Sequence, residues 1–228
     1  ARAFETDSDR LTERGEAQAA KLGLHLVRAG IDFDEVHTGT LVRQRRTAEI
    51  VGEAFAGSGK AFPALEANAG WNEYDAGGIL GALLPELVRR DAAFGALVAD
   101  FHAAAARPDR NRYFQRMFEV LMDAWHAGSL VHEGVESFAA FHGRVQSALR
   151  AVLHAGGRGN RRVAVFTSGG PVGVSVQEVL EAPTRSALKL NFRVKNASLT
   201  EMVFSEGRVS LETFNVVEYL ESSERTFR

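Results

Sequence analysis

The chain has 228 residues, with 27 Lys and Arg against 29 Asp and Glu, which gives a formal net charge of −2. This balance excludes a protein that coats nucleic acid or that binds acidic membranes through a polybasic face. The chain has no Cys, which excludes a disulfide scaffold, a thiolate zinc site and a Cys nucleophile. Because no run approaches the roughly 18 apolar residues of a membrane helix and no signal peptide is recognisable, we expect a globular protein of the cytoplasm.

The first part of the chain predicts a helix, a strand and a second helix. The first helix begins at Thr12, whose hydroxyl can cap it. A short strand with β-branched residues follows within residues 31–40. The next helix is expected over 41–55, with Thr40 as its N-cap.

The same order of strand and helix returns late in the sequence. Residues 163–166 form a continuous apolar run, which is typical of a parallel strand that is covered on both faces. Two glycines follow this run, and Pro171 is expected to open a helix. Two further strands are predicted within residues 197–220, joined by a hairpin turn at 205–207.

Residues 75–132 interrupt this alternation. Leu, Phe, Met and Trp residues recur there at helix-compatible intervals, with Pro85 and Pro108 as breaks. We therefore expect a single domain over 1–228 that carries a helical insertion at about 75–132. The fold class is predicted to be α/β with a mostly parallel sheet.

Two junctions between a strand and a helix are candidates for the chemistry, because ligands of open α/β sheets bind beyond the carboxyl ends of the strands. At the first junction, Arg43 lies in the opening turn of a helix, whose dipole already favours an anion. At the second junction, the Ser168 hydroxyl and the amides of Gly169 and Gly170 are available. Both junctions favour a phosphate or carboxylate ligand, although each one alone is more typical of a solvated Arg or of a tightly packed turn.

Five separated segments carry a resemblance to a known family. In chain order they are DRLTERGEAQAAKLGLHL, VHTGTLVRQRRTAEI, LEANAGWNEYDAGG, EGVESFAAFHGRV and AVFTSGGPVGV, and the later NASLTEMVF and FNVVEYL follow them. Together they resemble the histidine phosphatase superfamily, also called the phosphoglycerate-mutase-like family, over residues 9–75 and 133–220. The resemblance implies a three-layer α/β/α fold and leaves the insertion unmatched.

The resemblance also implies a chemistry. Members of the family attack a phosphoryl group with a His that follows the first strand, hold its oxygens with two Arg and a second His, and protonate the leaving oxygen with a Glu or Asp. This is covalent catalysis in a cationic pocket with a positioned general acid, and it requires neither metal nor cofactor. Arg43 of this chain corresponds to a phosphate-binding Arg, and Ser168, Gly169 and Gly170 correspond to the second catalytic loop.

Two departures from the family pattern concern its His residues. The Arg-His pair is expected shortly before the LTERG segment, at or just before Ala1, so we expect the nucleophile upstream of the given sequence. None of the seven His residues fits that role, and His37 is interpreted as structural. Ser168 stands where the second His is expected, and because its hydroxyl carries no charge, phosphate binding is expected to be weaker by about 1 to 3 kcal/mol.

Two carboxylates compete for the role of general acid. Glu73 is preferred to Glu66, because Trp-Asn-Glu is similar to the Leu-Asn-Glu of mutase-like members. An acid that acts near neutral pH needs a pKa that burial has raised. The alternative for either residue is a surface carboxylate in a loop.

The favoured function is a phosphomonoester hydrolase that acts through a phosphohistidine on a small phosphorylated substrate, with no metal, cofactor, nucleic acid or membrane involved. Two alternatives stay open, a phosphoglycerate-mutase type of phosphotransferase and a non-catalytic phosphate-binding or interaction protein on the same fold. The substrate, whose selectivity we expect to depend on residues 75–132, is left open, as is the choice between a monomer and a homodimer.

Overall fold

The computed structural model describes residues 9–155, 160–205 and 207–227. The helices are α1 (Glu13–Arg28), α2 (Val42–Gly57), α3 (Ala76–Gly78), α4 (Leu84–Arg90), α5 (Ala92–Ala103), α6 (Arg110–His126), α7 (Phe138–His154), α8 (Gly169–Val179) and α9 (Ser186–Asn191). The strands are β1 (Glu35–Thr38), β2 (Leu65–Ala67), β3 (Val163–Phe166), β4 (Leu199–Ser205) and β5 (Arg208–Val216). Short 3-10 or π-helical turns lie at Ala69–Trp71, Ile79–Leu83 and Ser222–Glu224. Within these ranges no helix has both the length and the apolar character that crossing a membrane requires.

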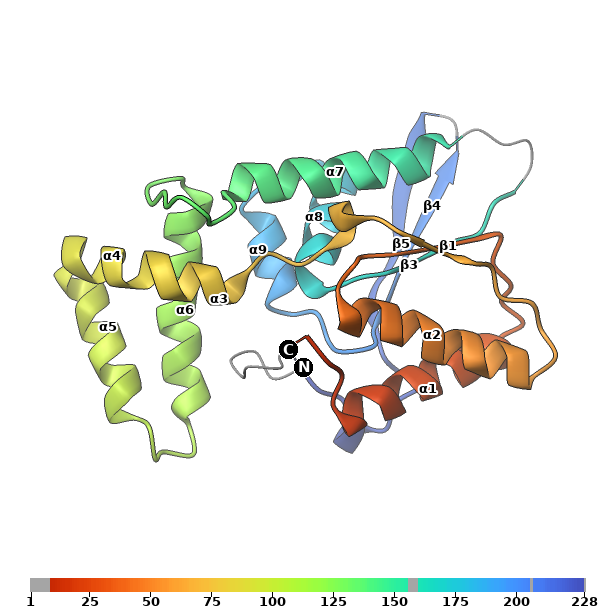
Figure 1. The fold of residues 1–228 in the computed structure, drawn as a ribbon, viewed down its shortest axis with the longest axis horizontal. Coiled ribbons are helices and arrows are strands. Elements are labelled where there is room, and N and C mark those ends of the chain that lie inside the picture. The colour runs from red at the N-terminus through yellow and green to blue at the C-terminus, as the bar shows by residue number, and fades with distance from the viewer. Residues whose placement is uncertain (1–8, 156–159, 206, 228) are drawn as a thin grey trace. The chain divides into compact units, whose positions relative to one another are not determined.

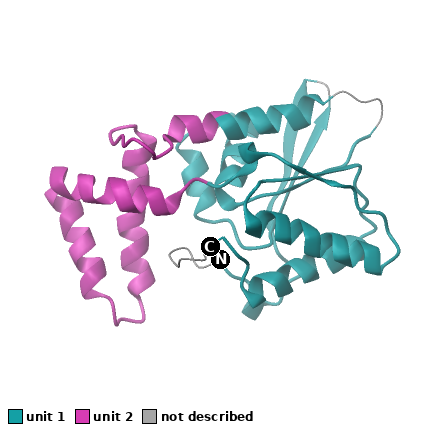
Figure 2. Ribbon diagram, viewed as in Figure 1, with its two compact units in different colours: residues 1–73, 144–228 teal, residues 74–143 magenta. Residues whose placement is uncertain are grey.

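The chain divides into two compact units (Figure 2). Unit 1 contains the residues up to Glu73 and those from Arg144 onward, whereas unit 2 contains Tyr74–Gly143. All strands of the described ranges belong to unit 1, and unit 2 is built from helices and turns. The α/β architecture is therefore a property of unit 1.

Unit 1 is organised around a parallel sheet with the strand order β2-β1-β3. In its register, Val36 lies opposite Leu65 and Ala164, and Thr38 lies opposite Phe166. Strands β4 and β5 form a separate antiparallel hairpin. Helices α1 and α2 lie on one side of the parallel strands, and α8 and the unit 1 part of α7 lie on the other (Figure 1). This arrangement confirms the predicted three-layer α/β/α fold.

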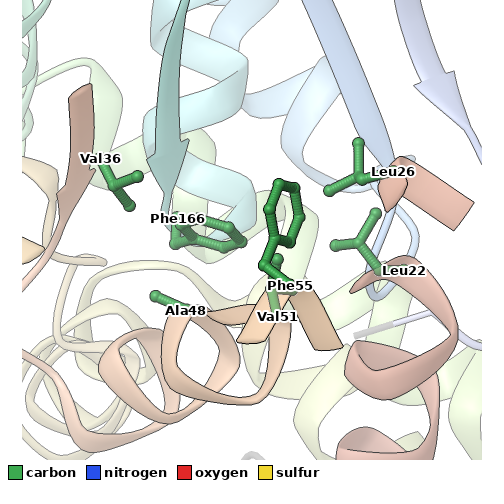
Figure 3. Packing of buried hydrophobic residues seen from close by; sticks show 7 residues of the cluster. All are labelled: Leu22, Leu26, Val36, Ala48, Val51, Phe55 and Phe166. Atoms are coloured by element: carbon green, nitrogen blue, oxygen red, sulfur yellow. The ribbon is translucent and has the colours of Figure 1, made fainter. Parts of the chain in front are cut away.

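A wholly apolar core joins the parallel sheet to α1 and α2 (Figure 3). Its buried members are Leu22, Leu26, Val36, Ala48, Val51, Phe55 and Phe166. Val51 and Phe55 are one helical turn apart and both are fully buried, so one face of α2 is pressed against the strands. Burial of a side chain such as that of Phe55 contributes roughly 1.5 to 3 kcal/mol. This packing fixes the start of α2 beside the carboxyl ends of β1 and β3.

Several predicted elements agree with the structure. The Thr12 hydroxyl caps α1 by accepting from the Gly15 amide at 3.1 Å. Strand β3 covers the predicted apolar run, and β4 and β5 form the predicted hairpin. Helix α8 begins two residues earlier than predicted, at Gly169, with Ser168 as its N-cap residue. Pro171 is compatible with this earlier start, because the first turn of a helix does not need its missing amide proton.

The predicted N-cap of α2 is wrong. The N-cap residue is Leu41 rather than Thr40, and its side chain offers no acceptor. The cap comes from a distant part of the chain, since Asp9 Oδ2 accepts from the Val42 amide at 2.8 Å. Thr40 is engaged with Asn72, whose Oδ1 accepts from the Thr40 amide and whose Nδ2 donates to the Thr40 hydroxyl, both at 2.7 Å.

Unit 2 has an aromatic core of its own around Trp125. The ring of Trp125 lies 5.3 Å from that of Tyr74, 5.2 Å from Phe138 and 5.9 Å from Phe141, measured between ring centroids. Its indole nitrogen donates to the Glu136 carbonyl at 2.8 Å. Aromatic pairs at such separations add to the stability that burial supplies, so unit 2 does not depend on the sheet for a core.

Candidate active site

The two strand-to-helix junctions meet at the carboxyl end of the parallel sheet. Strand β1 leads into α2, and the adjacent strand β3 leads into α8. The side chain of Gln44, one residue after Arg43, joins the two junctions, because its Nε2 donates to Ser168 Oγ at 2.9 Å. The N-termini of α2 and α8 therefore lie side by side, and both present the positive end of a helix dipole.

A third segment, residues 68–73 after β2, completes this edge. The Asn68 amide donates to the Thr38 carbonyl at 2.8 Å. The Trp71 carbonyl accepts from Gln44 Nε2 at 3.0 Å and from the Thr167 hydroxyl at 2.6 Å. Residues 68–73 are thus hydrogen-bonded to both junctions.

Arg43 lies in the first turn of α2 and is partly buried, with 20% of its side chain exposed. Its Nη1 donates to Asp9 Oδ1 at 2.8 Å. The other carboxylate oxygen of Asp9 caps α2. The guanidinium is therefore held at the helix N-terminus and already faces a carboxylate, as expected of a group that binds anions bidentately.

The second junction supplies a hydroxyl and backbone amides. Ser168 is the N-cap residue of α8, but its side chain caps no amide of that helix. The Gly170 amide donates to Glu73 Oε2 at 3.0 Å. Gly169 has a packing reason to lack a side chain, because a Cβ there would lie 2.6 Å from Asn191 Oδ1.

The structure separates the two candidate carboxylates. Glu73 is only 6% exposed and reaches the start of α8 through its contact with Gly170. Glu66 lies on β2 with 68% of its side chain exposed, and its carboxylate is 3.5 Å from Nδ1 of His37. Glu73 therefore joins Arg43 and Ser168 at one edge of the sheet, whereas Glu66 does not.

Two residues of the site carry no signal that sequence reasoning could use. Gln44 is a polar residue inside an amphipathic helix, and it is buried with 3% exposure. Arg144, on α7, holds the loop that carries Glu73. Its Nη1 donates to the carbonyls of Asn72 at 2.7 Å and of Gly70 and Ala69 at 3.2 Å each. Both residues resemble surface positions in the sequence and are recognised only by their long-range contacts.

His37 belongs to a charged cluster on the face of β1 opposite to Val36 and Thr38. Its Nε2 lies 3.2 Å from Glu35 Oε2. Arg161 binds the same carboxylate through Nε at 2.7 Å and Nη2 at 3.1 Å. The hydrogen bonds of Arg161, with a smaller contribution from His37, hold the pKa of Glu35 below its usual range.

The position that the family resemblance gives to the nucleophile, at or just before Ala1, lies outside the described residues, which begin at residue 9. Among the residues that are described, no group of three or more His, Asp or Glu side chains is placed to hold a metal ion.

The family of the chain follows from a comparison with family sequence models. The histidine phosphatase superfamily (branch 1) matches residues 3–217. The chain belongs to this superfamily. A search of curated proteins gives no significant match.

Solved structures of the same fold come from several organisms. The alpha-ribazole phosphatase from Shigella flexneri has a TM-score of 0.58 at 17% identity, covering 90% of this chain and 84% of its own. A phosphoglycerate mutase from Bacillus anthracis str. Sterne has a TM-score of 0.60 at 18% identity, covering 92% and 83%. The phosphoserine phosphatase from Entamoeba histolytica, solved in complex with 3-phosphoglyceric acid, has a TM-score of 0.62 at 15% identity, covering 96% and 90%. At these identities the likeness is one of fold.

Proposed function

We propose that the protein is a cytoplasmic phosphomonoester hydrolase that acts on a small phosphorylated substrate through a phosphohistidine. The observation that carries this proposal is the meeting of two helix N-termini, one bearing Arg43 and the other following Ser168, beside the carboxylate of Glu73. Such an edge attracts an anion through the helix dipoles and the guanidinium together. Membership of the superfamily supports the reaction class.

Each residue of the site has a role in this proposal. Arg43 binds two oxygens of the phosphoryl group, and Ser168 with the amide of Gly169 completes the pocket, whereas the Gly170 amide donates to Glu73 and holds the acid beside it. The nucleophilic His that the family resemblance implies attacks phosphorus, so that a P–N bond forms and the P–O bond to the substrate alcohol breaks. Glu73 gives its proton to the departing oxygen. Water then attacks the phosphohistidine and gives a proton back to Glu73, so that a P–O bond forms, the P–N bond breaks and inorganic phosphate is released.

The present partners of these groups support an anionic ligand. Arg43 donates to a carboxylate oxygen of Asp9, and Gly170 donates to a carboxyl oxygen of Glu73. Both donors therefore already point at oxygen acceptors before a substrate enters, which reduces the reorganisation that the reaction needs.

The decisive experiment compares two arginines of the same helix. Hydrolysis of an aryl phosphate is measured on the wild-type protein and on the Arg43→Ala and Arg45→Ala variants. Arg45 is exposed, so its loss changes net charge equally without touching the site. We expect kcat/KM to fall by about 100-fold or more in Arg43→Ala and to stay within about twofold of wild type in Arg45→Ala. Equal values for the two variants would exclude the proposed role of Arg43.

A non-catalytic phosphate-binding protein is the second candidate, and the uncharged Ser168 is the observation that favours it. That function predicts that the protein binds inorganic phosphate through Arg43 but hydrolyses no phosphomonoester. Measuring phosphate binding and phosphomonoester hydrolysis on the same preparations distinguishes the hydrolase from the non-catalytic binding protein.

A further inference from the structure

Gln44 is the polar side chain that connects the two junctions of the site. It is 3% exposed and follows Arg43 directly in α2. Its Nε2 makes two hydrogen bonds, at 3.0 Å to the Trp71 carbonyl and at 2.9 Å to Ser168 Oγ. The buried amide of Gln44 therefore contacts Ser168 of the proposed phosphate pocket, and Gln44 is adjacent in the sequence to Arg43, another residue of that pocket.

The orientation of this amide follows from its partners. The Trp71 carbonyl can only accept a hydrogen bond, so the group of Gln44 that faces it must be the nitrogen. The NH₂ group has two protons, one for the Trp71 carbonyl and one for Ser168 Oγ. Ser168 is therefore the acceptor in its contact with Gln44.

This assignment determines where the Ser168 hydroxyl proton is free to point. A hydroxyl has one proton to donate, and that proton cannot lie along the direction from which the Gln44 N–H approaches. No acceptor for this proton is found within residues 9–155, 160–205 and 207–227. The hydroxyl of Ser168 is thus left as an available donor at the N-terminus of α8.

The other end of the amide indicates that Gln44 is not there for packing. Its Oε1 is buried and has no hydrogen-bond partner among the described residues. A side chain without an oxygen, such as Met, would fill similar volume and leave no acceptor unpaired. Gly39 also makes room for it, because a Cβ at Gly39 would lie 1.8 Å from Gln44 Oε1.

We propose that Gln44 is a positioning residue of the phosphate site, whose amide nitrogen makes Ser168 an acceptor and so turns its single hydroxyl proton toward a phosphoryl oxygen. This inference rests on the proposed function, because it assumes that Arg43 and Ser168 hold a phosphoryl group. The contact with Gln44 explains how the uncharged hydroxyl of Ser168 acts as a hydrogen-bond donor to phosphate, because the direction of its proton is fixed before the ligand binds, as preorganisation requires.

The test is a double-mutant cycle with inorganic phosphate as the probe. Calorimetry on the full chain gives the Kd of wild type, Gln44→Met, Ser168→Ala and the double variant. We expect each single variant to raise Kd by about tenfold, and the double variant to be no weaker than Ser168→Ala alone, since without the hydroxyl nothing remains to be oriented. In Ser168→Thr, which keeps a hydroxyl, Gln44→Met must again raise Kd.

A second variant covers the case in which Gln44→Met does not fold. Gly39→Ala displaces the Gln44 amide by steric contact and keeps its chemistry, but its Cβ also lies 2.7 Å from Asn72 Oδ1, so its effect is read from the comparison with and without the Ser168 hydroxyl. Gly57→Ala at the end of α2, where a Cβ meets nothing within 4 Å, is its control. Gly39→Ala must weaken phosphate binding in the wild type but not in Ser168→Ala. Gly57→Ala must leave Kd unchanged in both.

The outcomes separate this inference from the function on which it rests. If wild type binds no phosphate, or if Arg43→Ala leaves Kd unchanged, the proposed function and the inference are both overturned. If Arg43→Ala raises Kd while Gln44→Met does not, or if Gln44→Met weakens binding equally with and without the Ser168 hydroxyl, only the positioning role is overturned.

Discussion

The carboxylate of Glu73 occupies a position that matters for both structure and chemistry. It accepts from the Gly170 amide at 3.0 Å and so caps α8 from a distant part of the chain. Arg144 holds the loop on which it stands through the carbonyls of residues 69–72. A buried carboxyl fixed in this way meets the positional requirement for a general acid, whereas the exposed Glu66 does not.

Substitution of Glu73 tests its proposed role as the acid. Glu73→Gln keeps an oxygen that can accept from Gly170 but removes the proton that an acid must donate. We expect kcat/KM to fall by about 100-fold for an alkyl phosphate, whose leaving oxygen needs protonation, and far less for a nitrophenyl phosphate, whose leaving group departs as an anion. The control is Glu66→Gln, for which both substrates should retain wild-type rates. Equal losses for the two substrates in Glu73→Gln would mean that Glu73 does not protonate the leaving group.

Residues of the site differ in how far the sequence could predict them. The places of Arg43 and Ser168 at the starts of two helices were predictable, because each follows a strand and precedes a helical pattern, which is a local signal. Gln44 was not, because a Gln in an amphipathic helix is usually solvated, and only its contacts with Trp71 and Ser168 distinguish it. The preference for Glu73 over Glu66 came from the family resemblance alone, and burial supplies its physical reason.

At the scale of elements, β1 and β3 are joined at their amino ends by an ion pair. Glu35 opens β1, and Arg161 lies two residues before β3. Because Arg161 stabilises the ionised carboxyl, the pKa of Glu35 is lower in the folded chain than the usual 4.5. Its contribution to stability is therefore complete above that usual value and is lost as the pH falls through the folded pKa.

This linkage predicts how Glu35→Gln behaves with pH. At pH about 7 the variant should be less stable than wild type by roughly 1 kcal/mol or less, since the carboxyl remains partly solvated. The difference should shrink as the pH falls below 4.5 and disappear once the pH lies below the lowered pKa of the folded chain. Urea denaturation over this range checks it. Glu53→Gln, which removes a more exposed partner of Arg46, should show little difference at any pH, and a Glu35→Gln deficit that persists in acid would contradict the linkage.

Elements were predictable where their signals are local. The apolar run of β3 and the two runs of the β4–β5 hairpin lie within single segments, and the predicted elements match the observed ones. The cap of α2 was missed, because the acceptor is Asp9 and not the adjacent Thr40. A hydroxyl next to a helix predicts an N-cap only when no other group binds that hydroxyl. Here Asn72 binds both the amide and the hydroxyl of Thr40.

For the whole molecule, each of the two units has its own buried core. The residues proposed to hold the phosphoryl group all belong to unit 1. Unit 2 has its own buried side chains, among them Leu121 with no exposure. Periodicity alone predicted helices in residues 75–132, but no recognisable motif indicates their arrangement around Trp125.

Leu121→Ala tests this independence. A cavity in the core of unit 2 should cost about 2 to 5 kcal/mol of local stability. Hydrogen exchange should therefore accelerate in α6, while the Kd of inorganic phosphate stays within about twofold of wild type. Val51→Ala, in the core of unit 1, should instead accelerate exchange in β1. A large rise in the phosphate Kd of Leu121→Ala would show that the two units are not separable in this way.

The parallel sheet keeps its ion pair and its proposed ligand pocket at opposite ends. Glu35 and Arg161 clamp the strands where they begin, whereas Gln44 and Ser168 meet just past the point where they finish. The contribution of this ion pair to stability and the proposed phosphate binding therefore depend on separate sets of side chains. An engineer seeking a heat-tolerant form of this protein has a region to modify, where the strands begin, that lies a full strand length from the junction of Gln44 and Ser168.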